Sequence, residues 1–112
     1  MASNDFSPDT PPHEIGHDEL LEAMEDGSRA IVDVREPHEF ASGHIPGSVN
    51  LPLSSFDAGD LPSGKPVVLV CMAGVRSARA LRQTLDAGVA DARHYYAPGM
   101  NGWRAHGGPV TL

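Results

Sequence analysis

Uninterrupted apolar runs in this chain alternate with segments in which apolar residues recur at helical spacing. The clearest run covers residues 66–71, where β-branched and other apolar residues follow Pro66 without a polar interruption. Such a run predicts a strand that is buried on both faces, as strands of parallel sheets are. Shorter runs of the same kind predict three further strands, at residues 30–34, 48–51 and 93–96.

Two helices are predicted before the buried run. The first covers residues 18–25 and ends at Gly27, because glycine readily adopts the left-handed conformation that closes a helix. The second begins within residues 36–40, with Pro37 near the first helical position, where its missing N–H costs nothing. Gly43 ends this second helix. The inner face of the first helix is expected to consist of Leu20, Leu21 and Met24.

Two more helices are predicted after the buried run. One covers residues 77–87 and is followed by Gly88 at the position where glycine commonly closes a helix. The other is short and covers residues 101–106. The inner face of the longer helix is expected to consist of Ala78, Leu81 and Leu85.

The alternation of strands and helices predicts an α/β domain with a mostly parallel central sheet and helices on both of its faces. The 112 residues suffice for one domain, which we expect at residues 13–112. Residues 1–12 are polar and rich in proline, and we interpret them as a mobile N-terminal extension. Ligands of parallel sheets bind beyond the carboxyl ends of the strands. Two predicted strands end there in chemically capable residues, one at Asp33 and Arg35 and the other at Cys71.

The composition narrows the function. A formal net charge of −7 argues against nucleic acid as a partner, because binding phosphates requires clustered Lys and Arg. No apolar run approaches the roughly 20 residues of a membrane span, so we expect no membrane partner. The N-terminus lacks the features of a signal peptide, and a single cysteine cannot form an internal disulfide. These features predict a cytoplasmic protein.

Cys71 lies where the buried strand turns into the following helix. A loop of this kind aims several backbone N–H groups at one point, to which the helix adds its positive end. Those donors and Arg76 would stabilise the thiolate, the nucleophilic form of cysteine, and Gly74 would let the loop curl tightly. The alternative is a small core residue at the end of a strand. The glycine and arginine that follow the cysteine favour the nucleophile.

Four segments together resemble the rhodanese family. Residues 32–40 and 43–52 resemble its first signature, residues 71–77 its active-site loop, and residues 99–103 with Pro109 its C-terminal signature. The resemblance extends from about residue 15 to residue 110. It implies a sulfurtransferase in which Cys71 takes sulfane sulfur from a donor, forms a persulfide and passes the sulfur to an acceptor. The usual assay of the family transfers sulfur from thiosulfate to cyanide.

The resemblance also assigns roles within the loop. The backbone of the loop would cradle the anionic sulfur, and Arg76 would close the loop and contribute charge. No cofactor is implied. The residues expected to bind the substrate are Met72, Ala73, Gly74, Val75 and Arg76, with Ser77 in a supporting position.

The same loop residues bear on three alternatives to free sulfur transfer: a phosphatase, a sulfur relay and a regulatory domain. Related cysteine phosphatases have a loop one residue longer, so the spacing from Cys71 to Arg76 favours sulfur over phosphate. Neutral Met72 and Ala73 stand where some members of the family carry basic residues that grip the substrate anion. This leaves open whether thiosulfate is a good donor and makes a persulfide or another thiol donor plausible. The main alternative is therefore a sulfur relay that serves a dedicated protein or thiol acceptor. The intact cysteine loop counts against a purely regulatory domain.

The remaining candidates each have a structural explanation. Asp33 and Arg35 either orient the cysteine loop or form an ion pair that joins elements of the sheet edge, and we favour the ion pair. His44 either assists proton movement at the loop or, as we favour, holds a turn by hydrogen bonds. Trp103 is expected to anchor the core. The six histidines lack the spacing of metal ligands, so no metal site is predicted.

Overall fold

Five parallel strands form the sheet of the computed structural model, which describes residues 13–88 and 94–112. The strands lie side by side in the order β1-β5-β4-β2-β3, and all four pairings are parallel. The predicted α/β class with a parallel sheet is therefore confirmed. Residues 1–12, expected to form a mobile extension, lie outside the described residues. The strands are β1 His13–Glu14, β2 Ala30–Asp33, β3 Val49–Asn50, β4 Val67–Val70 and β5 His94–Tyr95.

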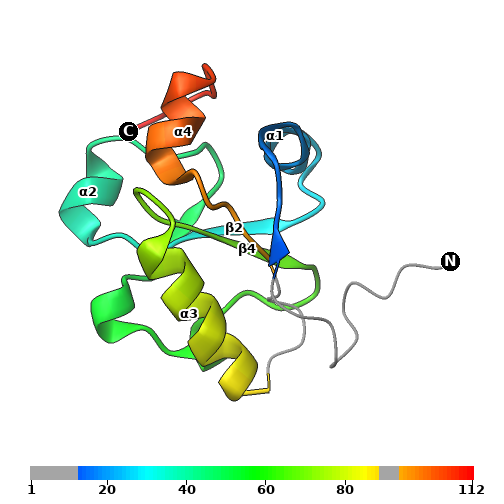
Figure 1. Ribbon diagram of the computed structural model, residues 1–112, viewed down its shortest axis with the longest axis vertical. Coiled ribbons are helices and arrows are strands. Elements are labelled where there is room, and N and C mark those ends of the chain that lie inside the picture. The colour runs from blue at the N-terminus through cyan, green and yellow to red at the C-terminus, as the bar shows by residue number, and fades with distance from the viewer. Residues whose placement is uncertain (1–12, 89–93) are drawn as a thin grey trace, which may run out of the picture.

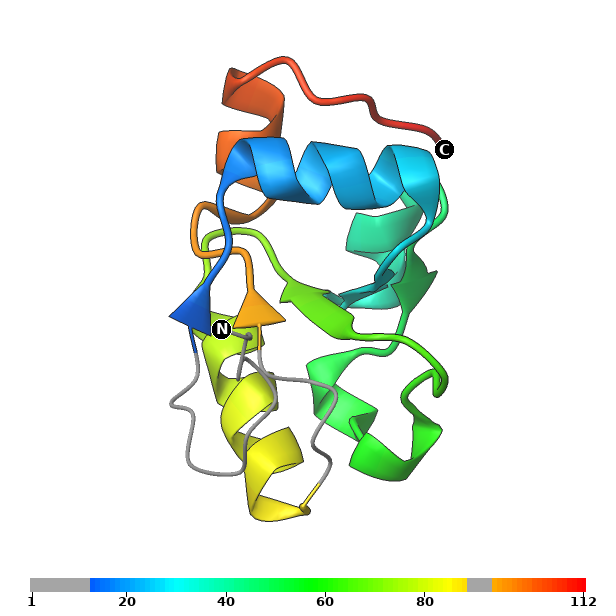
Figure 2. The same cartoon turned by 90° about the vertical axis from the view of Figure 1, so that its right-hand side faces the viewer.

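Helices cover both faces of the sheet, as the sequence predicted. Figure 1 shows α1 and α4 on one side of the strands and α3 on the other, and Figure 2 shows the same layers after a quarter turn. Two short 3-10 turns, η1 Leu53–Ser55 and η2 Ala58–Asp60, precede β4. None of the helices in the described segments has the length and apolar character that crossing a bilayer requires. The helices are α1 His17–Asp26, α2 Pro37–Ala41, α3 Val75–Asp86 and α4 Gly99–Ala105.

The four residues of β4 are all buried, and they alternate between two apolar layers. Val68 and Val70 pack on the side of α1 and α4, whereas Val67, Leu69 and the following Cys71 pack on the side of α3. This is why the sequence shows an uninterrupted apolar run at this place: both faces of the strand need apolar side chains. The cysteine thus emerges from the best-buried element of the domain.

Trp103 anchors the layer beneath α4, as expected. Its side chain is fully buried, its ring meets Tyr96 edge to face at a centroid distance of 6.3 Å, and its Nε1 donates to the carbonyl oxygen of Pro109 at 2.7 Å. The buried indole therefore has a hydrogen-bond partner, which a buried tryptophan requires. The C-terminal segment after α4 is tied to the core by this bond.

The structure corrects the prediction for α3 in two respects. The helix begins at Val75, two residues before the predicted start. Its buried residues include Ala80 and Leu81, while Ala78 is only half-buried. Ser77 and Thr84 complete the buried face, and the apolar pattern could not mark them because they are polar. Their hydroxyl groups donate to the carbonyl oxygens of Gly74 and Ala80, which offsets the loss of their hydration.

The first strand, β1, was not predicted from the sequence. It has two residues and pairs with β5, so that His13 lies opposite His94 and Glu14 opposite Tyr95. A two-residue strand carries too little periodicity to be recognised, since its pairing depends on a partner about 80 residues away. The helix α4 also begins at Gly99, two residues earlier than predicted.

Candidate functional site

Cys71 lies at the carboxyl end of β4, where the chain turns into α3. Its side chain is only 1% exposed and packs in the layer with Val34, Leu69 and Leu81. Burial holds the sulfur in one place. The loop that follows is short, because α3 already begins at Val75. The position agrees with the sequence prediction that the cysteine ends a buried strand and precedes a helix.

Two polar groups contact the cysteine sulfur. The backbone N–H of Gly74 donates to Sγ at 3.0 Å, and the Ser77 hydroxyl oxygen lies 3.5 Å from Sγ. The Ser77 hydroxyl itself donates to the carbonyl oxygen of Gly74 at 3.1 Å, so it can accept from the thiol S–H. An N–H group aimed at sulfur favours an anionic sulfur over a neutral one. Ser77, named from the sequence only as a supporting residue, is thus in direct contact with the sulfur.

The first N–H groups of α3 are further donors at the start of the helix that follows the cysteine loop. Those of Val75 and Arg76 precede any intrahelical acceptor, and they make no hydrogen bond within the described part of the chain. The sequence predicted a cradle of N–H groups from the whole loop. In the structure one of them, from Gly74, contacts Sγ. The other donors belong to the helix start and remain able to bind an anion that extends beyond Sγ.

The connection between β5 and α4 holds the loop from behind. The N–H groups of Met100 and Asn101 donate to the carbonyl oxygens of Cys71 and Met72 at 2.8 and 3.1 Å. Gly99, at φ +64°, allows this close approach, because a Cβ there would overlap the Met72 carbonyl. The sequence resemblance included this segment but gave no reason for it. Its role in the structure is to fix the first two carbonyls of the loop.

Gly74 lets the loop turn tightly, as the sequence suggested, and it also allows a close approach to another segment. It adopts φ +94°, a left-handed conformation that favours glycine. A Cβ at this position would overlap the carbonyl oxygen of Ala97, in the β5–α4 connection. The glycine therefore lets the loop pack against its support.

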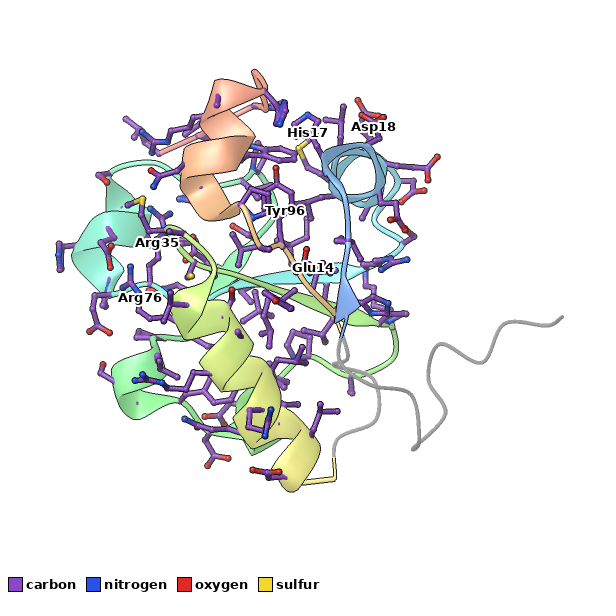
Figure 3. The ribbon with its side chains drawn as sticks, in the orientation of Figure 1. Glu14, His17, Asp18, Arg35, Arg76 and Tyr96 are labelled. Carbon is purple, nitrogen blue, oxygen red and sulfur yellow. The ribbon has the colours of Figure 1, made fainter. Side chains whose placement is uncertain are left out.

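Arg76 is held by a carboxylate that the sequence analysis did not identify. Its Nη1 and Nη2 donate to the two carboxylate oxygens of Glu39, on α2, at 2.7 and 3.0 Å. Figure 3 shows Arg76 and Arg35 on the side of the molecule where α2 lies. The sequence predicted that Arg76 closes the loop and contributes charge. In the structure its two terminal nitrogens pair with Glu39 and join the loop to α2, while the guanidinium stays within electrostatic reach of Cys71.

A third hydrogen bond holds the Glu39 carboxylate in place. One of its oxygens also accepts the backbone N–H of Glu36 at 2.9 Å, which closes the first turn of α2. Two hydrogen bonds from the Arg76 guanidinium, only partly offset by burial, lower the pKa of Glu39 from 4.5 to about 2. Glu39 in turn raises the pKa of Arg76, and Cys71 adds a smaller electrostatic contribution in the same direction. The pair is therefore charged at neutral pH.

Because of this ion pair, we expect the free energy of unfolding to depend on pH. The Glu39 pKa is lower in the folded than in the unfolded chain, so the stabilisation is complete above about pH 4.5 and is lost as pH falls toward 2. At pH 7 the free energy of unfolding should fall by about 1 kcal/mol in Glu39→Gln. In urea titrations, the difference in the free energy of unfolding between wild type and Glu39→Gln should shrink as the pH falls from 4.5 to 2. A matched change at exposed Glu25, Glu25→Gln, should show no such narrowing, and a constant difference for Glu39→Gln would contradict the assignment.

Asp33 and Arg35 form a buried ion pair at the end of β2. Arg35 Nη2 donates to Asp33 Oδ2 at 2.7 Å, and Nε lies 3.0 Å from both oxygens. Arg35 Nη2 also donates to the carbonyl oxygen of Gly43 at 2.8 Å, just after α2. The Asn50 amide donates to the carbonyl oxygens of Asp33 and Arg35, which connects β3 to the same group. These bonds join β2, β3 and the end of α2, and within the described residues none of them reaches the cysteine loop.

His44 contacts a turn and the C-terminal segment. Its Nδ1 lies 2.8 Å from the carbonyl oxygen of Phe40, and its ring stacks on Phe40 at a centroid distance of 3.7 Å. Its backbone exchanges two hydrogen bonds of 2.9 Å with Thr111. These contacts correspond to the turn-holding interpretation. Within the described residues, the partners of the imidazole come from α2 rather than from the cysteine loop.

The side chains at the loop surface are apolar and uncharged. Met72 is half-buried, Ala73 is exposed, and Val75 is 69% exposed. The described residues contain no group of three or more His, Cys, Asp or Glu side chains placed to hold a metal ion. The site therefore offers a buried sulfur nucleophile, N–H donors for an anion, and uncharged side chains at the surface of the loop.

Comparisons with known proteins agree with these observations. A model of the family described as "Rhodanese-like domain" matches residues 16–106. A sulfurtransferase from Allochromatium vinosum is 30% identical over 102 residues, which cover 88% of this chain and 94% of that protein. The thiosulfate:glutathione sulfurtransferase of Saccharomyces cerevisiae is 34% identical over 99 residues, with 74% of this chain and 70% of that protein covered.

A solved structure shows the same fold. The rhodanese-related protein of Thermoplasma volcanium superposes with a TM-score of 0.77 at 29% identity, and the match covers 89% of this chain and 98% of that one. Several curated relatives are much longer, since this chain spans only 21% to 46% of their length.

Proposed function

This chain belongs to the rhodanese-like domain family, whose relatives include sulfurtransferases, and we propose that Cys71 is the residue on which it carries sulfur. The observation that supports this most directly is the Gly74 N–H group, which donates to the Cys71 sulfur at 3.0 Å. A donor so placed stabilises the thiolate that attacks and the thiolate that later leaves. Cys71 is also the single cysteine of the chain, so no other thiol competes for the role.

The proposed reaction has two transfer steps. In the first, the Cys71 thiolate attacks the sulfane sulfur of the donor, a new S–S bond forms, and the old bond to that sulfur breaks. The electron pair leaves with the rest of the donor, as sulfite from thiosulfate or as a thiolate from a persulfide. In the second, a nucleophilic acceptor takes the outer sulfur and Cys71 leaves as thiolate. The acceptor becomes thiocyanate if it is cyanide and a persulfide if it is a thiol, so the cycle needs no further oxidant or reductant.

The free N–H groups of α3 support the intermediate. A persulfide extends the anionic charge one atom beyond Sγ, and the N–H groups of Val75 and Arg76 are available to an anion at the start of the helix. Cys71 must be a free thiolate at the start of each cycle, for which we propose a reducing compartment such as the cytoplasm.

A sulfur relay is the second candidate. In it the Cys71 persulfide is delivered to a dedicated protein or thiol partner and reacts little with small acceptors. The neutral side chains of Met72, Ala73 and Val75 favour it, because they offer a small inorganic anion no cationic contact. The two candidates share the persulfide and differ in what removes the sulfur.

Intact-mass measurement tests both candidates on the full chain. After incubation with thiosulfate or an alkyl persulfide and removal of the excess, we expect a gain of about 32 Da that dithiothreitol reverses. With one cysteine present, a thiol-labile sulfur reports Cys71. A chain that gains no sulfur from either donor would not be a sulfurtransferase. If the sulfur is gained but neither cyanide nor small thiols remove it, the relay is favoured over free turnover.

A further inference from the structure

We propose that Glu39 makes the Cys71 site selective for sulfur donors of low negative charge, the persulfides of organic thiols, over the inorganic dianion thiosulfate. The inference rests on the proposed function and adds the class of donor to it. Glu39 lies outside the cysteine loop, 37 residues before Arg76 in the sequence. Its role would be to set specificity through Arg76, without contact with the sulfur.

The cation at the end of the cysteine loop, Arg76, is already paired with a carboxylate. Arg76 donates from both Nη atoms to Glu39, at 2.7 and 3.0 Å, in the paired geometry that a guanidinium also uses for sulfonate or phosphate oxygens. Glu39 is held in turn by the N–H of Glu36. An incoming oxyanion would have to displace a carboxylate that is fixed from two sides. Thiosulfate therefore gains little from Arg76.

The charges at this end of the sheet nearly cancel. Arg76 is neutralised by Glu39, and Arg35 is neutralised by Asp33 in a buried pair. Glu36, half-buried at the start of α2, adds a negative charge, and Arg104, which donates to the Gly43 carbonyl oxygen, adds a positive one. The net charge of −7 on the whole chain therefore sets the sign of the field, and a dianion meets twice the repulsion of a monoanion. Removing the Glu39 charge beside Arg76 changes the encounter of a dianion by about tenfold at short range and low salt.

The exposed side chains of the cysteine loop and of the helix start are apolar. Val75 is 69% exposed at the first position of α3, and Ala73 is exposed as well. Met72 is half-buried and packs against the layer of α1 and α4, away from the layer of Cys71. Ala73 and Val75 give the oxygens of thiosulfate no hydrogen bond, but they offer apolar contact to the carbon atoms next to the sulfur of an organic persulfide. Charge and apolar contact thus favour the same class of donor.

The test compares two donors on wild type and Glu39→Gln. Thiosulfate is the dianion, and the persulfide of 2-mercaptoethanol carries its single negative charge on the terminal sulfur. Glutamine can still accept from Arg76 but removes the charge. We expect the second-order rate of sulfur uptake from thiosulfate to rise about tenfold in the variant, and the rate from the persulfide to change by less than about threefold.

Salt provides a readout that a structural role would not move. In wild type, added salt should raise the thiosulfate rate, because it screens repulsion; in Glu39→Gln it should lower the rate, because Arg76 now attracts the dianion. Glu25→Gln, on the exposed surface of α1, removes the same charge elsewhere and should leave the ratio of the two donor rates unchanged. Val75→Lys adds a cation at the exposed first position of α3. It should also raise the rate of sulfur uptake from thiosulfate, independently of the fold of α2.

The outcomes separate the two proposals. If the variants leave the donor ratio and the direction of the salt effect unchanged, the selectivity inference is wrong while sulfur transfer stands. The selectivity inference is also wrong if Glu39→Gln raises both donor rates equally. If wild type and variants take sulfur from neither donor, the proposed function fails, and the inference fails with it.

Discussion

Replacing Cys71 with serine should abolish sulfur uptake and leave the domain folded. A serine oxygen can take the place of Sγ and accept the N–H of Gly74, and the Ser77 hydroxyl remains in reach. A hydroxyl group is a weak nucleophile unless a base removes its proton, and the contacts of Sγ in the described residues include no base. The rate of uptake should fall by at least about a thousandfold, below detection by intact mass. The free energy of unfolding should stay within about 1 kcal/mol of wild type.

The matched control for this variant is Ala87→Ser. It introduces a hydroxyl at an exposed position at the end of α3, away from the cysteine loop, and keeps the cysteine, so uptake should stay close to that of wild type. A Cys71→Ser protein that still gained a thiol-labile mass of about 32 Da, one sulfur, would show that sulfur is carried elsewhere in the chain. A variant that unfolds in urea at a much lower concentration than wild type would show instead that the sulfur is a packing element.

The Arg35→Leu substitution should produce the largest loss of stability, about 3–5 kcal/mol. Arg35 is fully buried, and it donates to both oxygens of Asp33 and to the carbonyl of Gly43. Leucine would leave the Asp33 carboxylate buried with its side-chain partner removed, and the desolvation of that charge would no longer be compensated. For a chain of 112 residues this is a large part of the total stability.

Urea unfolding monitored by circular dichroism measures this effect, and two further variants interpret it. Arg82→Leu, on the exposed side of α3, makes the same substitution at the surface and should cost less than about 0.5 kcal/mol. The double variant Asp33→Leu with Arg35→Leu should recover part of the loss, because both charges are then removed. If Arg35→Leu alone cost no more than Arg82→Leu, the buried pair would not stabilise the fold.

Much of the fold could be predicted because local patterns determine it. The apolar run before Cys71 became β4, since a strand covered on both faces needs apolar residues at every position. Gly27 closes α1 at φ +68°, and Pro37 is at the start of α2. By contrast, the two-residue strand β1 and the buried Ser77 gave no apolar signal. Their places depend on hydrogen bonds to distant or backbone partners.

The residues of the candidate site, too, could be predicted only in part. The sequence identified Cys71, because a lone cysteine between a buried strand and a helix, followed by a glycine and an arginine, is a local pattern. It did not identify Glu39, although one signal was available: α2 follows β2 and the cysteine loop follows β4. If the two strands had been recognised as neighbours, residues after them could have been expected at the same edge of the sheet.

The sequence by itself determined the α/β class and the position of the cysteine between a buried strand and a helix, because both depend on residues that are close together in the chain. Only the tertiary structure decided the order β1-β5-β4-β2-β3, the support of the loop by Gly99, and the pairing of Arg76 with Glu39. The physical reason is distance along the chain. A hydrogen bond or ion pair between residues 37 positions apart leaves no periodic pattern in the sequence, and it forms only after the sheet has brought α2 and the start of α3 together.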